Sequence, residues 1–254
     1  MTISIKTQNK IPKRISKVYQ RFFFCCEWKK RYLYEKSRVG FLHLKTLFLY
    51  SPANLQFCVM KFNAEEFNKL IRNRRSTFPE QFEEGKKIDD VIVQQVIENA
   101  TWAPSHGNIQ PWQFVVFTET GLQKLARFQS ELYKESSGSK FKEASYQKLQ
   151  TNPLKASHVI ALCLKRDPNK KFPEVEEISA VATAVQNIYL SVTAYGIGGY
   201  WTTGGITYNE KAKPFFDLGE DDKLMGFFYM GHIAVPSPEQ KRKPIEEKVI
   251  WVRG

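Results

Sequence analysis

The sequence changes composition abruptly at Met60, and this break limits what the chain can fold into. The 59 residues before Met60 contain 12 Lys and Arg residues but only two acidic residues, Glu27 and Glu35. The other 195 residues contain 26 basic and 24 acidic residues, an ordinary balance for a soluble domain. The net charge of +12 therefore belongs mainly to the first segment, and it does not make the whole protein a nucleic-acid binder.

Residues 1–59 carry no clear signal for export or membrane insertion. Their most apolar stretch, residues 39–50, begins late for a secretory signal and contains His43 and Lys45. Polar residues interrupt every window of the about 20 apolar residues that a transmembrane helix needs, so we expect no stable membrane insertion. A transit peptide and a basic aromatic arm for anionic membranes or RNA stay open. We favour a non-core extension, with Met60 as the true start of a domain spanning residues 60–254.

The cysteines and histidines argue against disulfides and metal. Three of the four cysteines precede Met60, and only Cys163 lies in the remaining 195 residues. The expected core therefore lacks an even, spaced disulfide framework, which favours a reducing compartment and a cytoplasmic location. The four histidines are scattered and do not show the spacing of a zinc site, so we expect no metal.

Hydrophobic periodicity in residues 60–254 predicts one layered domain of the α+β or α/β class. Helices are expected over residues 64–73, from Asp89 or Asp90 to before Pro104, and over 121–135, 140–150, 174–195 and 209–216, and strands over 112–117, 159–164, 224–230 and 249–252. The nearly continuous apolar run at 112–117 indicates a strand buried on both faces. The pattern at 174–195 ends at Gly196, a typical left-handed helix end, and its small residues suit a subunit interface or a core.

Common catalytic signatures are missing from the sequence. It contains no P-loop, no G-x-S-x-G elbow and no H-E-x-x-H helix. Gly196 and Gly198 fail as a dinucleotide fingerprint, because Trp201 occupies the sixth position and because the pair ends a helix instead of beginning one. P-loop NTPases, ordinary α/β-hydrolases and zincins are therefore unsupported.

Three other features fit parts of one planar, phosphorylated ligand. The triplet Arg-Arg-Ser at residues 74–76 offers two guanidinium groups and a hydroxyl to a phosphate, although alone it is typical of a solvated basic helix end. The motif N-x-Q-P-W at 108–112 places amides that suit the edge of a heterocycle, or that satisfy their own backbone. The glycine-rich stretch 198–205 leaves N–H groups open to a ring, or forms an ordinary turn.

In this order, these features resemble the nitroreductase family of flavoproteins. The matching pieces are Arg74-Arg75-Ser76, Ala103-Pro104-Ser105 with the motif at 108–112 and Phe114, Gly196-Ile197-Gly198-Gly199, Gly226 with Gly231, and residues 241–247. The resemblance covers nearly all of residues 62–248. It implies an α+β homodimer with a three-layer fold, in which helices flank a central mixed sheet and each FMN lies at the subunit interface.

The same resemblance implies which residues bind the cofactor. They are Arg74, Arg75, Ser76 and Arg242 at or near the FMN phosphate, His106 and Asn108 at the flavin or its ribityl chain, and Trp201, Thr202, Thr203 and Gly204 beneath the isoalloxazine. The backbone N–H of Gly204 is expected near flavin N5. Many members of the family carry an acidic residue where Thr203 stands, so the substrate pocket is expected to differ from theirs.

The implied activity is that of an FMN-dependent oxidoreductase. NAD(P)H delivers hydride to flavin N5, and a nitroaromatic or quinone acceptor then takes two electrons, without a dedicated catalytic acid or base from the protein. No motif distinguishes NADH from NADPH. A dehalogenase or an ene reductase would share the fold. From a different class, the basic N-terminal segment suggests a nucleic-acid or membrane-surface binding protein, although no nucleic-acid partner is expected for the domain itself.

Overall fold

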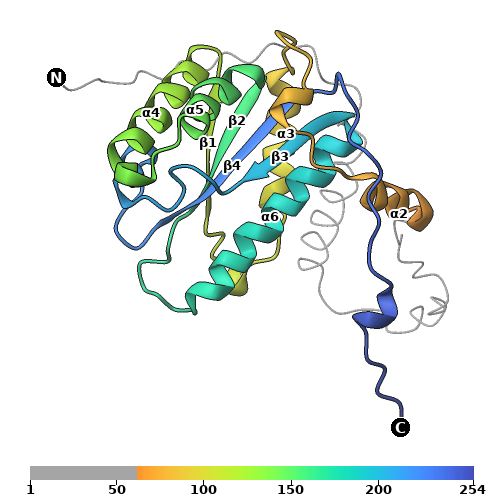
Figure 1. Cartoon of the computed structure of the whole chain (residues 1–254). Coiled ribbons are helices and arrows are strands. Elements are labelled where there is room, and N and C mark those ends of the chain that lie inside the picture. Colours follow the sequence, from red (N-terminus) through yellow and green to blue (C-terminus); the bar gives the residue numbers. More distant parts are fainter. Residues whose placement is uncertain (1–61) are drawn as a thin grey trace, which may run out of the picture. The chain divides into compact units, whose positions relative to one another are not determined.

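The computed structural model describes residues 62–254, so the N-terminal segment of residues 1–59 and its expected boundary at Met60 lie outside the described part (Figure 1). The five α-helices of this part are α2 (Ala64–Asn73), α3 (Asp90–Thr101), α4 (Thr120–Ser137), α5 (Glu143–Lys155) and α6 (Glu174–Ala194). The short 3-10 helices are η3 (Pro79–Gln81), η4 (His106–Asn108), η5 (Gly138–Lys140), η6 (Glu210–Phe216) and η7 (Ile245–Glu247).

Four strands form one sheet in the order β1-β2-β4-β3. They are β1 (Trp112–Thr118), β2 (His158–Leu164), β3 (Ile197–Thr202) and β4 (Lys223–His232). Every neighbouring pair in this sheet is antiparallel, whereas the family resemblance implied a mixed sheet. The reason is the strand order: β1 and β4 run in one direction and β2 and β3 run in the other, so no two neighbouring strands are parallel.

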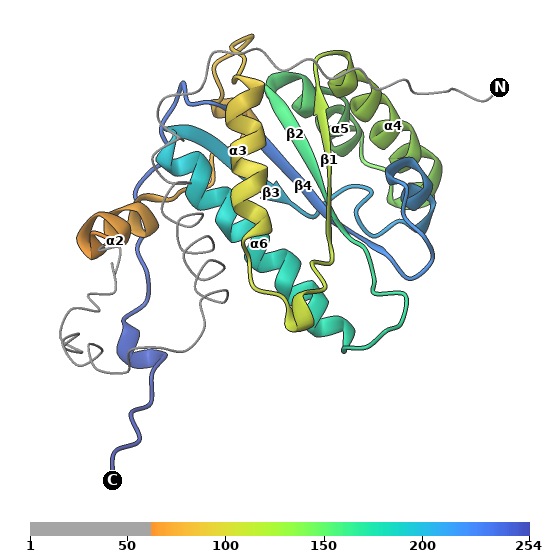
Figure 2. The ribbon, with the colours of Figure 1, turned by 180° about the vertical axis from the view of Figure 1, so that it is seen from behind.

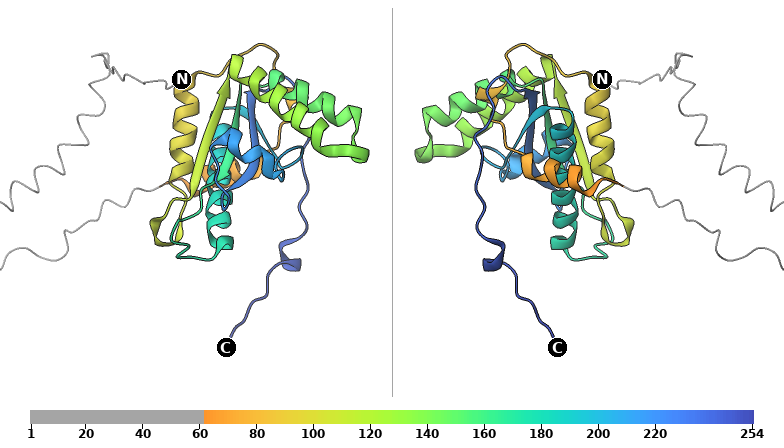
Figure 3. Two further views of the ribbon diagram at one scale, coloured as in Figure 1. Left: turned by 90° about the vertical axis from the view of Figure 1, so that its left-hand side faces the viewer. Right: turned by 90° about the vertical axis from the view of Figure 1, so that its right-hand side faces the viewer.

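Helices cover both faces of the sheet and divide the core into two clusters. Because successive strand residues point to opposite faces, Ile160 and Leu162 of β2 pack with α3 and α6, whereas Val159 and Ala161 pack with α4 and η6. Figure 2 shows α3 and α6 over one face, and Figure 3 shows the sheet edge-on between them and the α4–α5 pair. The expected three-layer α+β fold is confirmed, as is the buried strand at 159–164.

Helix α2 forms as the sequence predicts but buries none of its side chains. Asn63 caps it, because its side-chain oxygen accepts hydrogen bonds from the backbone N–H groups of Glu65 at 2.9 Å and Glu66 at 3.2 Å. Phe67 and Ile71, on the apolar side of α2, remain exposed. Local sequence therefore fixes this helix, which contacts α6 and leaves only Leu70 of its apolar side half-buried.

The glycine-rich stretch is partly a strand rather than an open turn. Residues 197–202 form β3, and Gly196 before them has φ +68°, the left-handed helix end that was expected. A Cβ at Gly199 would lie 2.6 Å from the ring of Phe228, and one at Gly198 would lie 2.9 Å from Phe82 and Thr77. These two glycines therefore permit close packing, and only Gly204 and Gly205 remain in a loop after the strand.

Two expected strands differ from the structure. Strand β1 is at the sheet edge and is only partly covered, with Val116 39% exposed, because nothing pairs with its outer side within residues 62–254. Residues 249–252 form no strand, and Ile250 and Val252 are almost fully exposed. Figure 1 shows this C-terminal tail extending away from the sheet, so it has no edge with which to pair.

No helix among residues 62–254 combines the length and the apolar character that crossing a membrane requires. The cytoplasmic location stays a prediction from the sequence.

Candidate functional site

Tyr189 of α6 brings together three of the expected site residues. The Arg74 guanidinium lies over the Tyr189 ring, 4.8 Å from its centroid. The Ser76 hydroxyl is 3.3 Å from the Tyr189 hydroxyl, and the backbone N–H of Trp201 donates to the same hydroxyl at 2.8 Å. Tyr189 is only 8% exposed, so its ring and hydroxyl together link the end of α2, the start of the next loop and strand β3 from inside the fold.

The helical pattern at residues 174–195 contains Tyr189 but gives it no role. A polar hydroxyl among aliphatic residues was the available signal, because a buried tyrosine needs a hydrogen-bond partner. The partner could not be identified in advance, since Ser76 lies 113 residues away in the sequence.

The other two expected arginines are not gathered at Tyr189. The Arg75 guanidinium turns back and donates to the carbonyl oxygens of Arg72 and Arg74. Arg242 lies exposed on the C-terminal tail and donates to the Gln240 side chain at 3.4 Å. The arrangement of the described chain therefore leaves Arg242 without a contact to the Arg74–Ser76 segment.

The C-terminal tail nevertheless passes beside this segment. The Ser237 hydroxyl donates to the backbone carbonyl oxygen of Ser76 at 2.7 Å. Arg242 follows five residues later. This anchor at Ser237 keeps the start of the tail near the expected phosphate position.

His106 and Asn108 lie at the opposite end of α6 from Tyr189. His106 bonds to the carboxylate of Glu176, near the start of α6, and its ring stacks on Phe172 with centroids 3.7 Å apart. Asn108 accepts a hydrogen bond from the Gln110 side chain at 3.0 Å, so its amide is partly satisfied within its own loop. Tyr189 lies 13 residues beyond Glu176, or about 20 Å at the rise of an α-helix. One chain therefore does not bring these two groups of residues together.

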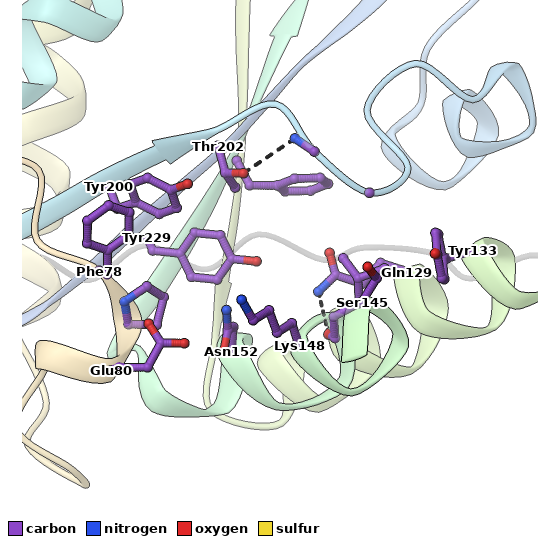
Figure 4. Close-up of a pocket in the computed structure, with 15 residues that line it drawn as sticks. Phe78, Glu80, Gln129, Tyr133, Ser145, Lys148, Asn152, Tyr200, Thr202 and Tyr229 are labelled. Carbon is purple, nitrogen blue, oxygen red and sulfur yellow. Dashed lines mark hydrogen bonds between the residues drawn. The ribbon is translucent and has the colours of Figure 1, made fainter. Parts of the chain in front are cut away.

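The residues expected beneath the isoalloxazine divide between two faces of the sheet. Thr202 and Gly204 line a cavity of about 350 Å³ on the face covered by α4 and α5. Trp201 and Thr203 line a second cavity of about 530 Å³ on the opposite side. This division follows from the alternation of side chains along an extended segment. The first cavity is shown in Figure 4, where Gln129, Lys148 and Asn152 form a helical wall across from Thr202.

The loop after β3 presents a backbone donor at the first cavity. The N–H of Gly204 makes only a long contact of 3.4 Å with the Thr202 hydroxyl oxygen, and Gly204 is exposed. Its carbonyl oxygen is held by the Thr207 hydroxyl, which donates at 2.9 Å. The loop is thus fixed while this N–H remains available to a ligand.

Tyr229 of β4 supplies a protonated hydroxyl to the same cavity. Burial raises the pKa of Tyr229 to about 12, and the neighbouring Gln129 side chain acts in the opposite direction. Since the phenol remains protonated at neutral pH, it can donate as well as accept a hydrogen bond.

A hydrogen-bonded chain of a serine, a histidine and an aspartate, away from the cavities described above, has a structural role. The Ser157 hydroxyl is 2.9 Å from His158 Nδ1, and His158 Nε2 is 3.0 Å from Asp90. The Ser157 oxygen also accepts the N–H of Ile88 at 2.7 Å, and His158 is 2% exposed. This hydrogen-bonded chain fastens the start of α3 to β2 and offers a substrate no access. In the range 62–254, no three His, Cys, Asp or Glu residues gather as a metal site would require.

Comparison with known proteins identifies the family. Residues 71–232 match the model of the Nitroreductase family, which is more than half of the chain. The chain belongs to the nitroreductase family. This confirms the resemblance and the expected oxidoreductase class.

Individual relatives support the family assignment. The Escherichia coli protein named "Putative NAD(P)H nitroreductase YdjA" is 28% identical over 180 residues, covering 67% of this chain and 94% of that protein. Iodotyrosine deiodinase of Danio rerio is 29% identical over 226 residues, covering 80% of this chain and 72% of the relative.

Solved structures share the fold. A nitroreductase-like family protein from Bacillus cereus has a TM-score of 0.63 at 22% identity, covering 76% of this chain and 98% of the other. The nitroreductase NfnB, an FMN- and NADPH-dependent protein from a Sphigopyxis strain, has a TM-score of 0.54 at 18% identity, covering 72% of this chain and 97% of the other. At these identities the likeness concerns the nitroreductase fold alone.

Proposed function

We propose that this protein is an FMN-dependent oxidoreductase that uses NAD(P)H to reduce nitroaromatic or quinone acceptors. The observation that carries the proposal is the convergence of Arg74, Ser76 and the end of β3 on Tyr189, together with an available N–H at Gly204 in the loop that follows β3. The names of YdjA and NfnB, which refer to NAD(P)H and FMN, support it.

The residues present suit the two chemically distinct ends of FMN. The Arg74 guanidinium rests on an aromatic ring instead of beside a carboxylate, so its charge is available to a phosphate, and the Ser76 hydroxyl can add a hydrogen bond. The Gly204 N–H can donate to flavin N5, which favours the correct orientation of the ring. Bound FMN would supply the hydride transfer, while the protein binds and orients it.

We further propose that the working unit is a homodimer whose second copy completes each site. His106 and Asn108 lie about 20 Å along α6 from Tyr189, so within one chain they cannot serve the same cofactor as Arg74. In a dimer, the partner's loop can supply them. The exposed apolar side of α2 and the exposed Ile250 and Trp251 of the tail provide surface for such an association.

Mixing the FMN-loaded protein with NADH or NADPH without oxygen should bleach the absorbance of oxidised flavin, because the proposed site allows a nicotinamide to reach N5. Stopped-flow absorbance measures the rate with each donor and reveals which is preferred. Subsequent addition of a nitroaromatic or a quinone should restore the oxidised spectrum. Failure of both donors to bleach the flavin would refute the proposed electron transfer.

Reductive dehalogenation is the second candidate, and the deiodinase relative from Danio rerio favours it. If the acceptor is a halophenol, the reduced protein should release iodide from iodotyrosine, whereas a nitroaromatic should be reduced slowly. Measuring free iodide under turnover with the preferred nicotinamide separates the two reactions. Rapid nitro reduction without iodide release would exclude the dehalogenase alternative.

A further inference from the structure

A proline in α5 leaves one backbone acceptor without its helical partner. In an α-helix, the carbonyl oxygen of Leu149 accepts from the N–H of residue 153, but that residue is Pro153, which has no N–H. The Gln129 side chain of α4 takes this place, and its Nε2 donates to the Leu149 carbonyl oxygen at 2.6 Å. The proline therefore provides the anchor that holds Gln129.

This anchor fixes which amide atom of Gln129 remains available. Since Nε2 is committed to a carbonyl oxygen, turning the amide over would place two acceptor oxygens against each other. Gln129 is fully buried and lines the cavity of about 350 Å³, and its Oε1 has no hydrogen-bond partner within residues 62–254. The side-chain oxygen of Asn152, the residue before Pro153, is also buried without a hydrogen-bond partner within residues 62–254. Asn152 lines the same cavity.

Two unpartnered buried oxygens in one cavity are unusual. Most buried polar atoms in proteins have a hydrogen-bond partner, and each exception costs stability. The Tyr229 hydroxyl of β4 lies at the same cavity and is also buried. A ligand that brings its own donor would satisfy the amide oxygens, and this gives the cavity a chemical preference.

We propose that three residues, here named the recess, select the electron acceptor. They favour acceptors in which the ring that bears the reducible group also bears a substituent with an O–H or N–H group. The recess consists of Gln129, Asn152 and Tyr229. This inference rests on the proposed function and specifies its substrate class. Neutral acceptors without such a donor would leave the Asn152 oxygen unsatisfied after excluding water from the cavity, and would leave the Gln129 oxygen only the neighbouring Tyr229 hydroxyl as a donor. The recess therefore discriminates between acceptors of equal electron affinity.

The position of the recess favours the acceptor over the cofactor as its ligand. Arg74 and Ser76 meet Tyr189, which packs in the cluster of α3 and α6 on one face of the sheet. The recess lies on the other face, where Tyr229 packs in the α4 cluster. Figure 4 shows the side-chain amides of Gln129 and Asn152 across the cavity from Thr202. Thr202 ends β3, and the loop with the Gly204 N–H follows it. A second molecule can thus enter between the recess and that loop.

The test compares two probes that differ in one donor, 4-nitrobenzyl alcohol and its methyl ether. Isothermal titration calorimetry on the FMN-loaded, oxidised full chain measures the dissociation constant of each. We expect the alcohol to bind about fivefold more tightly, as one net hydrogen bond implies. In Gln129→Leu, this ratio should fall toward one, because one of the two acceptor oxygens is gone. The matched control Gln147→Leu, on the exposed side of α5, should keep the wild-type ratio.

Pro153→Ala tests the same idea without removing Gln129. The new N–H can donate to the Leu149 carbonyl oxygen, so the Gln129 amide loses its anchor and the preference for the alcohol should decrease. This variant should fold, since it restores a helical hydrogen bond. If Gln129→Leu does not fold, Pro153→Ala still tests whether the position of the Gln129 amide causes the preference for the alcohol. An unchanged ratio in every folded variant would overturn the proposal.

The dissociation constant of FMN, measured by quenching of its fluorescence, separates this inference from the proposed function. If the recess serves the acceptor, Gln129→Leu should bind FMN as the wild type does. Weaker FMN binding with an unchanged probe ratio would mean that the recess binds the flavin, and this would refute the inference. A wild-type protein that binds no FMN would instead refute the proposed function.

Discussion

Replacing Arg74 with alanine is expected to raise the dissociation constant of FMN by about 10- to 150-fold. The variant loses a charge-assisted hydrogen bond to the phosphate, which contributes about 1.5–3 kcal/mol, and each 1.4 kcal/mol is about a factor of ten. The Arg74 side chain rests on the buried Tyr189, so its position is set before a ligand arrives. Fluorescence quenching of FMN by increasing amounts of protein measures the constant.

The matched control is Arg72→Ala, which removes an exposed arginine two residues earlier on α2. It should leave FMN binding nearly unchanged, and Arg74→Lys should bind FMN with intermediate affinity because it keeps the charge but loses the planar fork. Wild-type binding should also weaken with added salt, and this salt dependence should be smaller in Arg74→Ala. Equal losses from Arg72→Ala and Arg74→Ala would indicate a general electrostatic effect instead of a phosphate contact.

Elements with local signals were predicted closely from the sequence. The helix expected over residues 64–73 coincides with α2, and Gly196 marked the end of α6. The edge position of β1 could not be predicted, because a run of apolar residues looks the same whether one or two strands flank it. For β3 the glycines suggested a loop, since the rings that require them, such as Phe228, are distant in sequence.

The residues of the candidate site also fall into a group that the sequence predicted and a group that it did not. Family motifs predicted Arg74, Ser76 and Trp201, and the structure places all three at Tyr189. Tyr189 and Gln129 were not predicted as site residues, because their roles depend on partners from other elements. Gln129 acquires its role only when α4 packs on α5 and meets the carbonyl oxygen that Pro153 leaves unpaired. The roles at FMN of all the residues expected from the family resemblance stay predictions.

Gly226 is expected to tolerate no side chain, because β4 passes close to the end of β3 at this point. Its φ of +118° is a conformation that other residues rarely adopt, and a Cβ would collide with the backbone carbonyl oxygen of Thr202. Gly226 also lies where the pairing of β2 with β4 shifts register between Leu162 and Cys163. Gly226→Ala should therefore lower the free energy of unfolding by about 2–5 kcal/mol, through backbone strain and overpacking.

Urea unfolding monitored by circular dichroism measures this loss, with the slope of the transition checked for two-state behaviour. The control is Gly219→Ala, where a Cβ would meet nothing closer than the Asp222 carboxylate at 3.6 Å; its stability should stay within about 0.5 kcal/mol of the wild type. Because the collision displaces Thr202, Gly226→Ala should also weaken FMN binding at the Gly204 loop even in the fraction that remains folded. A Gly226→Ala protein as stable as the control would show that the two strands can separate at no cost, and the fixed geometry assigned to the Gly204 donor would then be wrong.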